Sequence, residues 1–379
     1  MTTRVHDIGA LLGNERFLEA FHESLETGGP PPLLNCAKIK LTSRCNLRCT
    51  MCKYWQTETE EVLSSERWQA VFGELRELGC RKVHFSGGEV FLRPDFLDLA
   101  EAAVGLGLKV NLTTNGTLLS KDSARRLARM GVNGVSVSLD GATRKLHNRV
   151  RGRDYAYRRT LRALGWLRRY SPDLTLRVNF VLMRTNYEAL PEMVRLAGEL
   201  GANDLLPMPV DEKGPRRLRL SSREIRHYNR EIAPRVAELR GRYGFTGHPA
   251  AVFPFGVTEE EIHLSAQGLY ARGFFERRAC LAPWLHAFFA WDGATYLCCM
   301  TNGRMESLGN VGRQSVREVF HGEGFRRVRA DFLAGRHLPA CHRCDLFLAE
   351  NARLHDALET RAFDEAAPSG ASEECAPAR

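Results

Sequence analysis

Three cysteines with short, fixed spacing lie near the start of the chain. Cys45, Cys49 and Cys52 fall within the segment SRCNLRCTMCKYW. A structural zinc site is usually closed by a fourth thiolate or a histidine, and neither follows nearby. Three thiolates on a cubane iron–sulfur cluster instead leave one iron free for a substrate or cofactor. The spacing therefore favours an iron–sulfur cluster, with zinc as the alternative.

A second set of cysteines occurs in the C-terminal third of the sequence. In WDGATYLCC, Gly293 stands five residues before Cys298, which Cys299 follows directly. The segment LPACHRCDLF adds a CxxC pair, Cys341 and Cys344, and Cys280 lies upstream. A CxxC pair with two distant cysteines is a common zinc pattern, so spacing alone favours structural zinc here.

The composition is that of a soluble globular protein: 379 residues, 44% hydrophobic and 26% charged. No stretch approaches the roughly 18 uncharged apolar residues of a membrane helix. The first residues carry Asp and Glu and lack the cleavage site of a secretory signal. We therefore expect a cytoplasmic protein with no membrane partner, in which grouped cysteines bind metal or act in catalysis rather than form disulfides.

The net charge raises the question of nucleic-acid binding. Lys and Arg number 54 against 45 Asp and Glu, a net charge of +9. The arginines are spread along helical segments such as SARRLARM, and no aromatic-basic recognition motif occurs. A solvated basic surface is the favoured interpretation. A non-enzymatic, metal-containing nucleic-acid-binding protein is kept as a remote alternative.

Strand and helix patterns alternate through the first half of the chain. In SSERWQAVFGELRELG, apolar residues from Trp68 to Leu78 fall on one helical face after a serine N-cap. Glycines that follow helical patterns, such as Gly79 and Gly131, are placed as helix C-caps. Six strands alternating with helices predict a parallel α/β sheet, either doubly wound or a partial barrel. The predicted strands are 38–43, 82–86, 109–114, 134–139, 174–182 and 203–208.

Three segments with small and polar residues follow predicted strands. They are SGGEVFLRPD, TTNG and SLDG. Gly87 and Gly88 allow a ligand to approach the backbone closely, and Glu89 can accept hydrogen bonds from an ammonium group. Each segment alone reads as an ordinary turn. Because all of them share the carboxyl edge of the sheet with the three-cysteine loop, we expect a ligand site there.

These segments together resemble the radical S-adenosylmethionine (radical SAM) enzymes over roughly residues 36–210. CNLRCTMC matches the CxxxCxxC motif of that family, SGGEVFLRPD its GGE segment, and TTNG, SLDG and HNRVRG look like segments found in many members. The resemblance implies an α/β fold, a partial (β/α)6 TIM-like barrel. It also implies a [4Fe–4S] cluster held by Cys45, Cys49 and Cys52, with an open iron that chelates S-adenosylmethionine.

The same resemblance assigns residues to S-adenosylmethionine binding. Gly87, Gly88 and Glu89 would hold the methionyl amine, Asn115 and Ser138 would lie near the ribose or methionine, and Arg151 would pair with the carboxylate. Met51 replaces the aromatic residue common before the third cysteine, and its thioether can still cover the adenine.

The C-terminal cysteines resemble the auxiliary-cluster domains of this superfamily, SPASM and its shorter twitch form. The full pattern continues with two more cysteines after the CxxC pair, and DLFLAENARLHD has none. The likeness is therefore to the twitch form, with one auxiliary [4Fe–4S] cluster. Its implied ligands are Cys280, Cys298, Cys341 and Cys344, with Cys298 preferred over Cys299 because of its distance from Gly293.

These features divide the chain into five expected parts. They are an N-terminal leader (1–36), the core barrel (37–210), a linker and helix (211–249), a smaller irregular cluster-binding domain (250–355) and a disordered tail (356–379). Pro234 is expected to kink or break a helix around 222–241.

The resemblance implies that the enzyme cleaves S-adenosylmethionine to a 5′-deoxyadenosyl radical, which abstracts a substrate hydrogen. A fully ligated auxiliary cluster suits a net oxidation, as in an aminocyclitol dehydrogenase. We therefore expect a biosynthetic oxidoreductase acting on a small carbohydrate-like metabolite, with flavodoxin or ferredoxin as electron donor. The alternative is crosslinking, epimerisation or oxidation of a ribosomally made peptide, for which residues 1–36 are too short to form a leader-recognition domain.

No general acid or base can be assigned from the sequence. An epimerase would need a hydrogen-donating thiol, for which Cys299 or Cys80 could serve. Other candidates lie in segments expected at the barrel mouth, although each residue is more often a surface or packing residue. They are Asp211, Glu212, Arg216, Arg217, His248 and Trp284.

Overall fold

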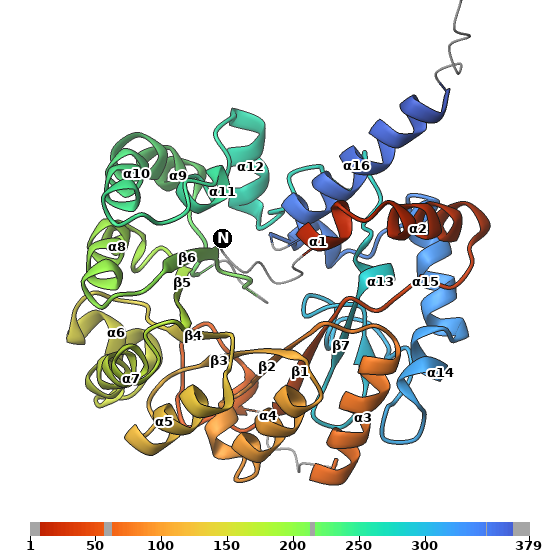
Figure 1. Ribbon diagram of the computed structural model, residues 1–379. Helices are drawn as coiled ribbons and strands as arrows, with labels where there is room; N and C mark the ends of the chain where they lie inside the picture. The colour runs from red at the N-terminus through yellow and green to blue at the C-terminus, as the bar shows by residue number, and fades with distance from the viewer. Residues whose placement is uncertain (1–7, 57–62, 213–216, 346, 367–379) are drawn as a thin grey trace, which may run out of the picture.

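The computed structural model describes residues 8–56, 63–212, 217–345 and 347–366. Arg216, residues 1–7 of the predicted leader and residues 367–379 of the predicted tail lie outside these ranges. Within them, eight strands form a single sheet in the order β6-β5-β4-β3-β2-β1-β7-β8 (Figure 1). The strands are Cys36–Thr42 (β1), Lys82–Gly87 (β2), Lys109–Thr114 (β3), Gly134–Ser138 (β4), Thr175–Leu182 (β5), Asp204–Pro209 (β6), His286–Phe289 (β7) and Thr295–Tyr296 (β8).

The first six strands are parallel and follow one another in chain order. All six coincide with the predicted strands to within two residues at either end. The choice that periodicity left open is settled for the partial barrel, because consecutive strands are neighbours throughout and the sheet curves. The expected α/β partial barrel is confirmed.

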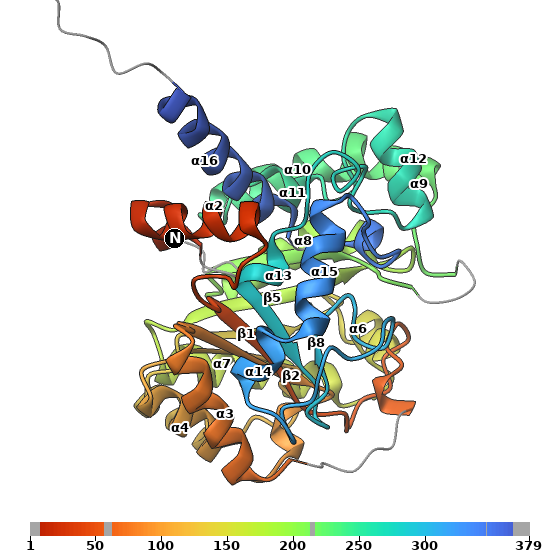
Figure 2. The same cartoon turned by 90° about the vertical axis from the view of Figure 1, so that its right-hand side faces the viewer.

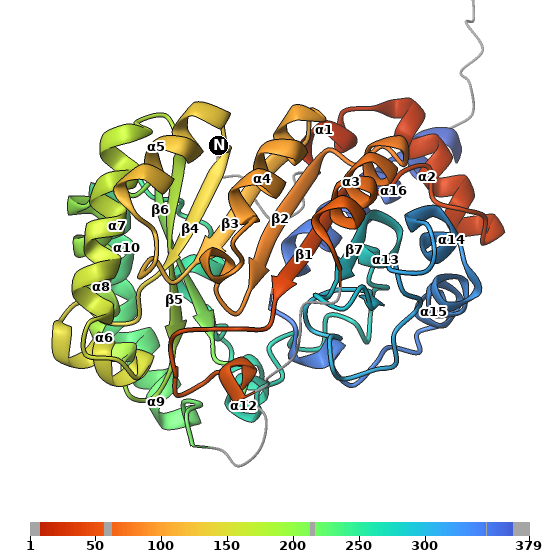
Figure 3. The same cartoon turned by 90° about the horizontal axis from the view of Figure 1, so that it is seen from below.

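Helices cover the outer face of the curved sheet (Figures 1 and 3). The helices of the barrel half are α3 (Ser65–Glu77), α4 (Phe96–Gly105), α5 (Lys121–Met130), α6 (Arg144–Arg151), α7 (Ala156–Tyr170) and α8 (Leu190–Glu199). Ser64 caps α3 by accepting from the amide of Arg67, as predicted. Gly131 ends α5 with a φ of 76°, a conformation that glycine adopts without strain.

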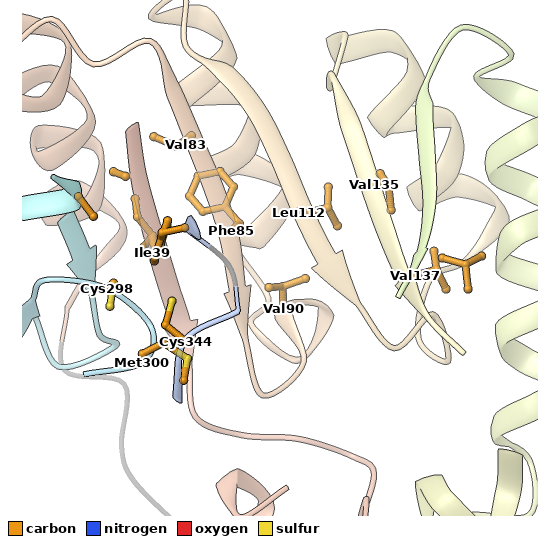
Figure 4. Close-up of a cluster of buried hydrophobic side chains, with 14 of the residues drawn as sticks. Ile39, Val83, Phe85, Val90, Leu112, Val135, Val137, Cys298, Met300 and Cys344 are labelled. Atoms are coloured by element: carbon orange, nitrogen blue, oxygen red, sulfur yellow. The ribbon is translucent and has the colours of Figure 1, made fainter. Parts of the chain in front are cut away.

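In β1, β2 and β3 the outward-facing side chains are mainly apolar and the inward-facing ones mainly polar. Ile39 and Phe85 belong to the main hydrophobic core, and the ring of Phe85 packs against those of Phe72 in α3 and Phe96 in α4. Figure 4 shows the apolar side chains of β1 to β4 in this cluster. Because successive residues of a strand point to opposite faces, Lys38 and Lys40 face the interior of the barrel.

The C-terminal part continues the barrel sheet. Strand β7 pairs in parallel with β1, and β8 returns antiparallel to β7. A parallel partial barrel leaves β1 as an edge, and β7 satisfies its free hydrogen-bonding groups. The cluster-binding region expected at 250–355 is thus joined to the barrel through the sheet. Its helices are α11 (Pro249–Val252), α12 (Glu259–Gln267), α13 (Ala282–Leu285), α14 (Val316–Phe320) and α15 (Glu323–Leu333).

The two ends of the described chain pack together on this region. Helices α1 (Gly9–Leu12) and α2 (Glu15–Thr27) lie against α13 and α16 (Leu348–Ala366), as Figure 2 shows. Phe21 of α2 and Trp284 of α13 are buried in this contact. The expectation of a disordered tail is wrong for residues 356–366, because α16 is anchored by apolar contacts such as that of Leu354.

The segment after β6 is helical without interruption from Ser222 to Arg242, so Pro234 does not break it. Helix α9 (Ser222–His227) passes into a π-helical turn at Tyr228–Ile232, and α10 (Ala233–Arg242) begins with Pro234 in its first turn. The described residues contain no helix long and apolar enough to cross a membrane.

Candidate active site

The first cysteine loop leaves β1 and packs against the GGE segment. The amide of Gly88 donates to the carbonyl of Thr42 (2.8 Å), and that of Glu89 to Arg44 (2.8 Å). A side chain at Gly88 would collide with the carbonyl of Arg44. Glycine is therefore required at this position because the cysteine loop packs against it. The close approach that we expected from a ligand is made by the loop.

The other side of the loop is held by the end of α6. The amide of Arg48 donates to the carbonyl of Arg151 (3.2 Å), and that of Thr50 to Val150 (2.9 Å). Gly152 follows with a φ of 69°, and a side chain there would strike the carbonyl of Arg48. The HNRVRG segment thus fixes the cysteine loop through two backbone hydrogen bonds and the close packing at Gly152.

The three thiols gather in a small apolar cluster of their own. Cys45, Cys49 and Cys52 pack with Leu47 and Ala156. Burial raises the pKa of Cys45 to about 11 and also raises that of Cys49. Metal binds the thiolate form, which burial disfavours. The positive charge of iron would therefore be needed to stabilise the thiolates in this setting. Three gathered thiols, of which Cys49 is buried and Cys45 and Cys52 are half-buried, fit a cluster that leaves one iron open.

Glu89 connects the ends of β2 and β3. Its buried carboxylate accepts from the hydroxyl of Thr114 (2.7 Å) and from the amides of Asn115 (2.7 Å) and Phe91 (3.3 Å). A carboxylate offers about four acceptor positions, so one remains for an ammonium group.

Asn115 and Ser138 lie at the same edge of the sheet. The side-chain amide of Asn115 donates to Asn46 (2.9 Å) and lies 4.0 Å from the sulfur of Cys45. Ser138 ends β4, in register with Asn179 of β5. The structure brings Asn115 against the cysteine loop and Ser138 to the adjoining strand end.

Arg151 reaches the same loop with its side chain. Its Nη1 lies 3.7 Å from the sulfur of Cys49, and its Nη2 lies 2.6 Å from Oδ2 of Asp140. Burial alone lowers the pKa of Arg151, but the carboxylate of Asp140 raises it above its ordinary value. Asp140 belongs to the SLDG segment but was not among the residues predicted to act there. The available signal was an acidic residue directly after a buried strand, which needs a cationic partner.

The second thiol set surrounds one buried cavity. Cys280, Cys298, Cys341 and Cys344 line it, together with apolar residues such as Met300 and Phe347. Burial raises the pKa of Cys341 to about 11 and that of Cys298 to about 12. Figure 4 shows Cys298 and Cys344 beside Met300, near β1. Among the described residues no His, Cys, Asp or Glu side chains converge on a point suited to one metal ion. The four thiols border one common space, as the ligands of a multi-iron cluster do.

Family models match two separate parts of the chain. The radical SAM superfamily model covers residues 39–197, and the iron–sulfur cluster-binding SPASM model covers 280–345. The chain belongs to the radical SAM superfamily. The two matched domains imply S-adenosylmethionine and a [4Fe–4S] cluster in the barrel and an iron–sulfur cluster in the SPASM region.

Relatives with curated names match different shares of this radical SAM enzyme. The PqqA peptide cyclase of Bradyrhizobium diazoefficiens is 34% identical over 50% of the chain and 49% of the relative, and that of Streptomyces rochei is 38% identical over 46% and 47%. The chain thus spans about half the length of these cyclases. The AdoMet-dependent heme synthase of Methanosarcina barkeri is 28% identical over 76% of the chain and 83% of the relative.

Solved structures share the fold of this radical SAM enzyme at low identity. Streptococcus suis SuiB bound to its precursor peptide SuiA superposes with a TM-score of 0.62 at 17% identity, covering 81% of this chain and 69% of SuiB. The protein anSMEcpe, with AdoMet and a peptide bound, gives a TM-score of 0.60 at 19% identity, covering 88% and 98%.

Two thiols outside the ligand sets of this radical SAM enzyme have different surroundings. Cys80 is buried in the core and donates to the carbonyl of Lys82, so it cannot reach a substrate, and its expected role as hydrogen donor is wrong. Cys299 is half-buried and packs against the cluster of Phe288, Ala290 and Ala294. Burial and the neighbouring thiols of Cys52 and Cys299 raise the pKa of Tyr54 to about 12. Cys299 therefore stands near the first cysteine loop.

Residues expected at the barrel mouth have mostly structural roles. Asp211 forms ion pairs with Arg304 and Arg343, and Glu212 accepts from the amides of Arg217 and Leu218. His248 caps the N-terminus of α11. Trp284 is buried against the N-terminal helices and does not lie at the mouth.

Proposed function

We propose that this radical SAM enzyme modifies a ribosomally made peptide or protein. The observation that carries the proposal is the 34–38% identity of its core to PqqA peptide cyclases. The fold shared with SuiB and anSMEcpe is compatible with it. The relatives named above lend no support to the expected carbohydrate-like substrate, so the peptide alternative replaces it.

The residues of this chain would divide the work between binding and positioning. Cys45, Cys49 and Cys52 would hold the first cluster, and the free acceptor position of Glu89 would bind the methionyl ammonium. When bound, the cluster and S-adenosylmethionine supply a 5′-deoxyadenosyl radical that takes a hydrogen atom from the substrate. The apolar packing of Leu47 and Ala156 around the thiols would help to exclude water from that step.

The second thiol set would complete an oxidation. Cys280, Cys298, Cys341 and Cys344 would hold the auxiliary cluster as an electron acceptor, and a flavodoxin or ferredoxin would return electrons to the enzyme. A peptide crosslink replaces two bonds to hydrogen by one new bond. It therefore releases one hydrogen atom to the deoxyadenosyl group, one electron to the acceptor and one proton to solvent.

A second candidate is a heme precursor as substrate. It is favoured by the heme synthase match, which extends over 83% of that relative although at 28% identity. This candidate predicts S-adenosylmethionine cleavage that rises with an iron tetrapyrrole and stays unchanged with peptides.

The test is anaerobic reconstitution followed by dithionite reduction and measurement of 5′-deoxyadenosine. Candidate peptides are those encoded beside the gene. We expect formation of 5′-deoxyadenosine, together with a peptide that has lost two hydrogens by mass spectrometry. Zinc in place of iron in the first loop would remove the radical chemistry. Modification of the tetrapyrrole alone would replace the peptide by the second candidate.

A further inference from the structure

Helix α16 contacts the short segment that carries Cys280 and leads into α13. The imidazole Nε2 of His355 donates to the carbonyl of Ala279 at 2.8 Å. One turn earlier in the helix, the side-chain oxygen of Asn351 accepts from the amide of Leu281 at 2.6 Å. Residues four apart lie on the same face of a helix, so this face of α16 holds the segment on both sides of Cys280.

The side-chain amide of Asn351 is buried, and its orientation is fixed. Asn351 is 2% exposed. Its oxygen accepts from a backbone amide, that of Leu281, and its nitrogen donates to a backbone carbonyl, that of Phe347, at 2.7 Å. The amide cannot turn over without losing both hydrogen bonds, so the identities of its nitrogen and oxygen follow from their partners.

The nitrogen of Asn351 has a second hydrogen, and the nearest acceptor for it is a thiol sulfur. The distance from this nitrogen to the sulfur of Cys280 is 3.8 Å. Within the described residues, no other side chain forms an N–H to sulfur hydrogen bond with the second thiol set. The hydroxyl of Thr301 lies 4.0 Å from the sulfur of Cys298, but it donates to the backbone carbonyl of Cys298 at 3.0 Å.

A hydrogen bond to a cysteine sulfur favours the reduced form of an iron–sulfur cluster. The added electron increases the negative charge on the sulfur ligands, and an N–H donor stabilises that charge. Cys280 is 6% exposed, and apolar residues such as Met300 and Phe347 share the cavity that it lines. Because solvent is largely excluded there, a single protein donor has a larger effect than it would have at the surface.

We propose that Asn351 is a positioning residue that raises the reduction potential of the auxiliary cluster through its hydrogen bond to Cys280. The inference deepens the proposed function and rests on it, since the four thiols are there the ligands of that cluster. A higher potential makes the cluster a better electron acceptor. In the crosslinking step the substrate radical loses one electron, the auxiliary cluster gains it, and one proton passes to solvent.

The test is a redox titration of the reconstituted full-length enzyme, in which EPR follows the reduced clusters. The form with Cys45→Ala, Cys49→Ala and Cys52→Ala keeps only the auxiliary cluster and identifies its signal. At the wild-type midpoint, the ratio of reduced to oxidised auxiliary cluster should fall about tenfold in Asn351→Leu, a shift of about 59 mV to lower potential for one electron.

Asn351→Asp makes the same comparison with a side chain of nearly the same shape. Its carboxylate can still accept from the amide of Leu281, but an anionic oxygen replaces the N–H donor beside Cys280. The shift should therefore have the same sign as in Asn351→Leu and be at least as large. Wild-type potentials in both variants would overturn the proposal.

His355→Leu is the matched control on the same helix. It removes the contact of α16 with Ala279 and leaves every donor to sulfur in place. The reduced to oxidised ratio should stay within about twofold of the wild type. A shift as large as that of Asn351→Leu would assign the effect to loosened packing of α16 and overturn the proposal.

A measurement without any change at Asn351 covers the case in which its variants lose the auxiliary iron. Asparagine labelled with ¹⁵N in the side-chain amide should give a nitrogen hyperfine coupling in the EPR signal of the reduced auxiliary cluster. The form that lacks the three thiols of the first loop excludes a contribution from Asn115, which lies near Cys45. Absence of the coupling would overturn the hydrogen bond.

The outcomes separate this inference from the proposed function. A peptide that stays unmodified defeats the proposed substrate, while the potentials of the auxiliary cluster can still be compared. Only about four iron atoms per chain in the wild type would remove the auxiliary cluster and overturn this inference together with its ligand set.

Discussion

Arg151 joins the first cysteine loop to a buried carboxylate. Its guanidinium lies 3.7 Å from the sulfur of Cys49 at one nitrogen and 2.6 Å from Asp140 at another. Asp140 is itself fixed by the amide of Val181 at 2.8 Å. The ends of β4, β5 and α6 thus converge on one thiol, and Asp140 positions the cation that we expect to meet the S-adenosylmethionine carboxylate.

Removal of Arg151 should be costly even without any cofactor. Arg151→Met leaves Asp140 fully buried without its cation, and breaking a buried ion pair costs about 3–5 kcal/mol. We expect that loss in the free energy of unfolding of the cluster-free protein, measured with denaturant. The double variant with Asp140→Asn should recover part of it. Arg149→Met, on the exposed side of α6, is the control, and an equal effect there would contradict a structural role for the pair.

Iron content should distinguish Cys298 from Cys299. Two four-iron clusters give about eight iron atoms per chain. Cys344→Ala and Cys298→Ala should lower this to about four, whereas Cys299→Ala should leave it unchanged because Cys299 lies outside the thiol-lined cavity. Iron assay and the absorbance of the reconstituted protein provide the measurement. Loss of iron in Cys299→Ala with retention in Cys298→Ala would exchange the two assignments.

Local patterns predicted the strands and the grouping of the thiols, because strand periodicity and cysteine spacing depend on neighbouring residues. Contacts between distant segments were not predictable in the same way. Trp284 was expected at the barrel mouth, but its position depends on helices near the N-terminus, more than 250 residues earlier in the chain. The pairing of β7 with β1 likewise joins distant parts of the chain, and local periodicity carries no information on which strands pair.

The sequence predicted which residues make up the candidate site, but not the contacts that explain why each residue is there. Gly88 was identified correctly as a position of close approach, yet the approaching group is the carbonyl of Arg44. Cys80 and Cys299 looked equivalent in sequence, and only burial separates them. Lys38 and Lys40 gave no signal, since lysines in a strand ordinarily indicate a solvent-facing side, whereas here they face the barrel interior.

Glu89→Gln should weaken S-adenosylmethionine binding by about tenfold or more, because an amide replaces the charge that attracts the methionyl ammonium. The substitution also replaces an acceptor of the Thr114 and Asn115 hydrogen bonds, so stability should fall by about 1–3 kcal/mol. Calorimetric titration and thermal unfolding measure the two effects. Glu77→Gln, at an exposed position of α3, is the matched control, and unchanged affinity in Glu89→Gln would remove the ammonium from this position.

His147 should make the cluster-free protein sensitive to acid. Burial, and then the nearby charge of Arg151, lower its pKa from an ordinary value near 6.5 to about 3, while its Nδ1 accepts from the amide of Asp140 at 3.1 Å. The folded state therefore keeps a neutral imidazole, whereas the unfolded chain takes up a proton below about pH 6.5. The stability that His147 allows is fully present above that pH and is lost as the pH falls toward 3.

The contribution can be isolated with His147→Asn, whose amide oxygen can still accept from Asp140. Between about pH 7 and pH 5 the wild type should lose about 2 kcal/mol more unfolding free energy than this variant, since each unit below the unfolded pKa costs about 1.4 kcal/mol. Parallel pH series of denaturant unfolding give the comparison. His263→Asn, at an exposed position of α12, should follow the wild type. Parallel pH profiles of the wild type and His147→Asn would mean that His147 has the same pKa in the folded and unfolded states. The described burial of the imidazole beside Arg151 would then be wrong.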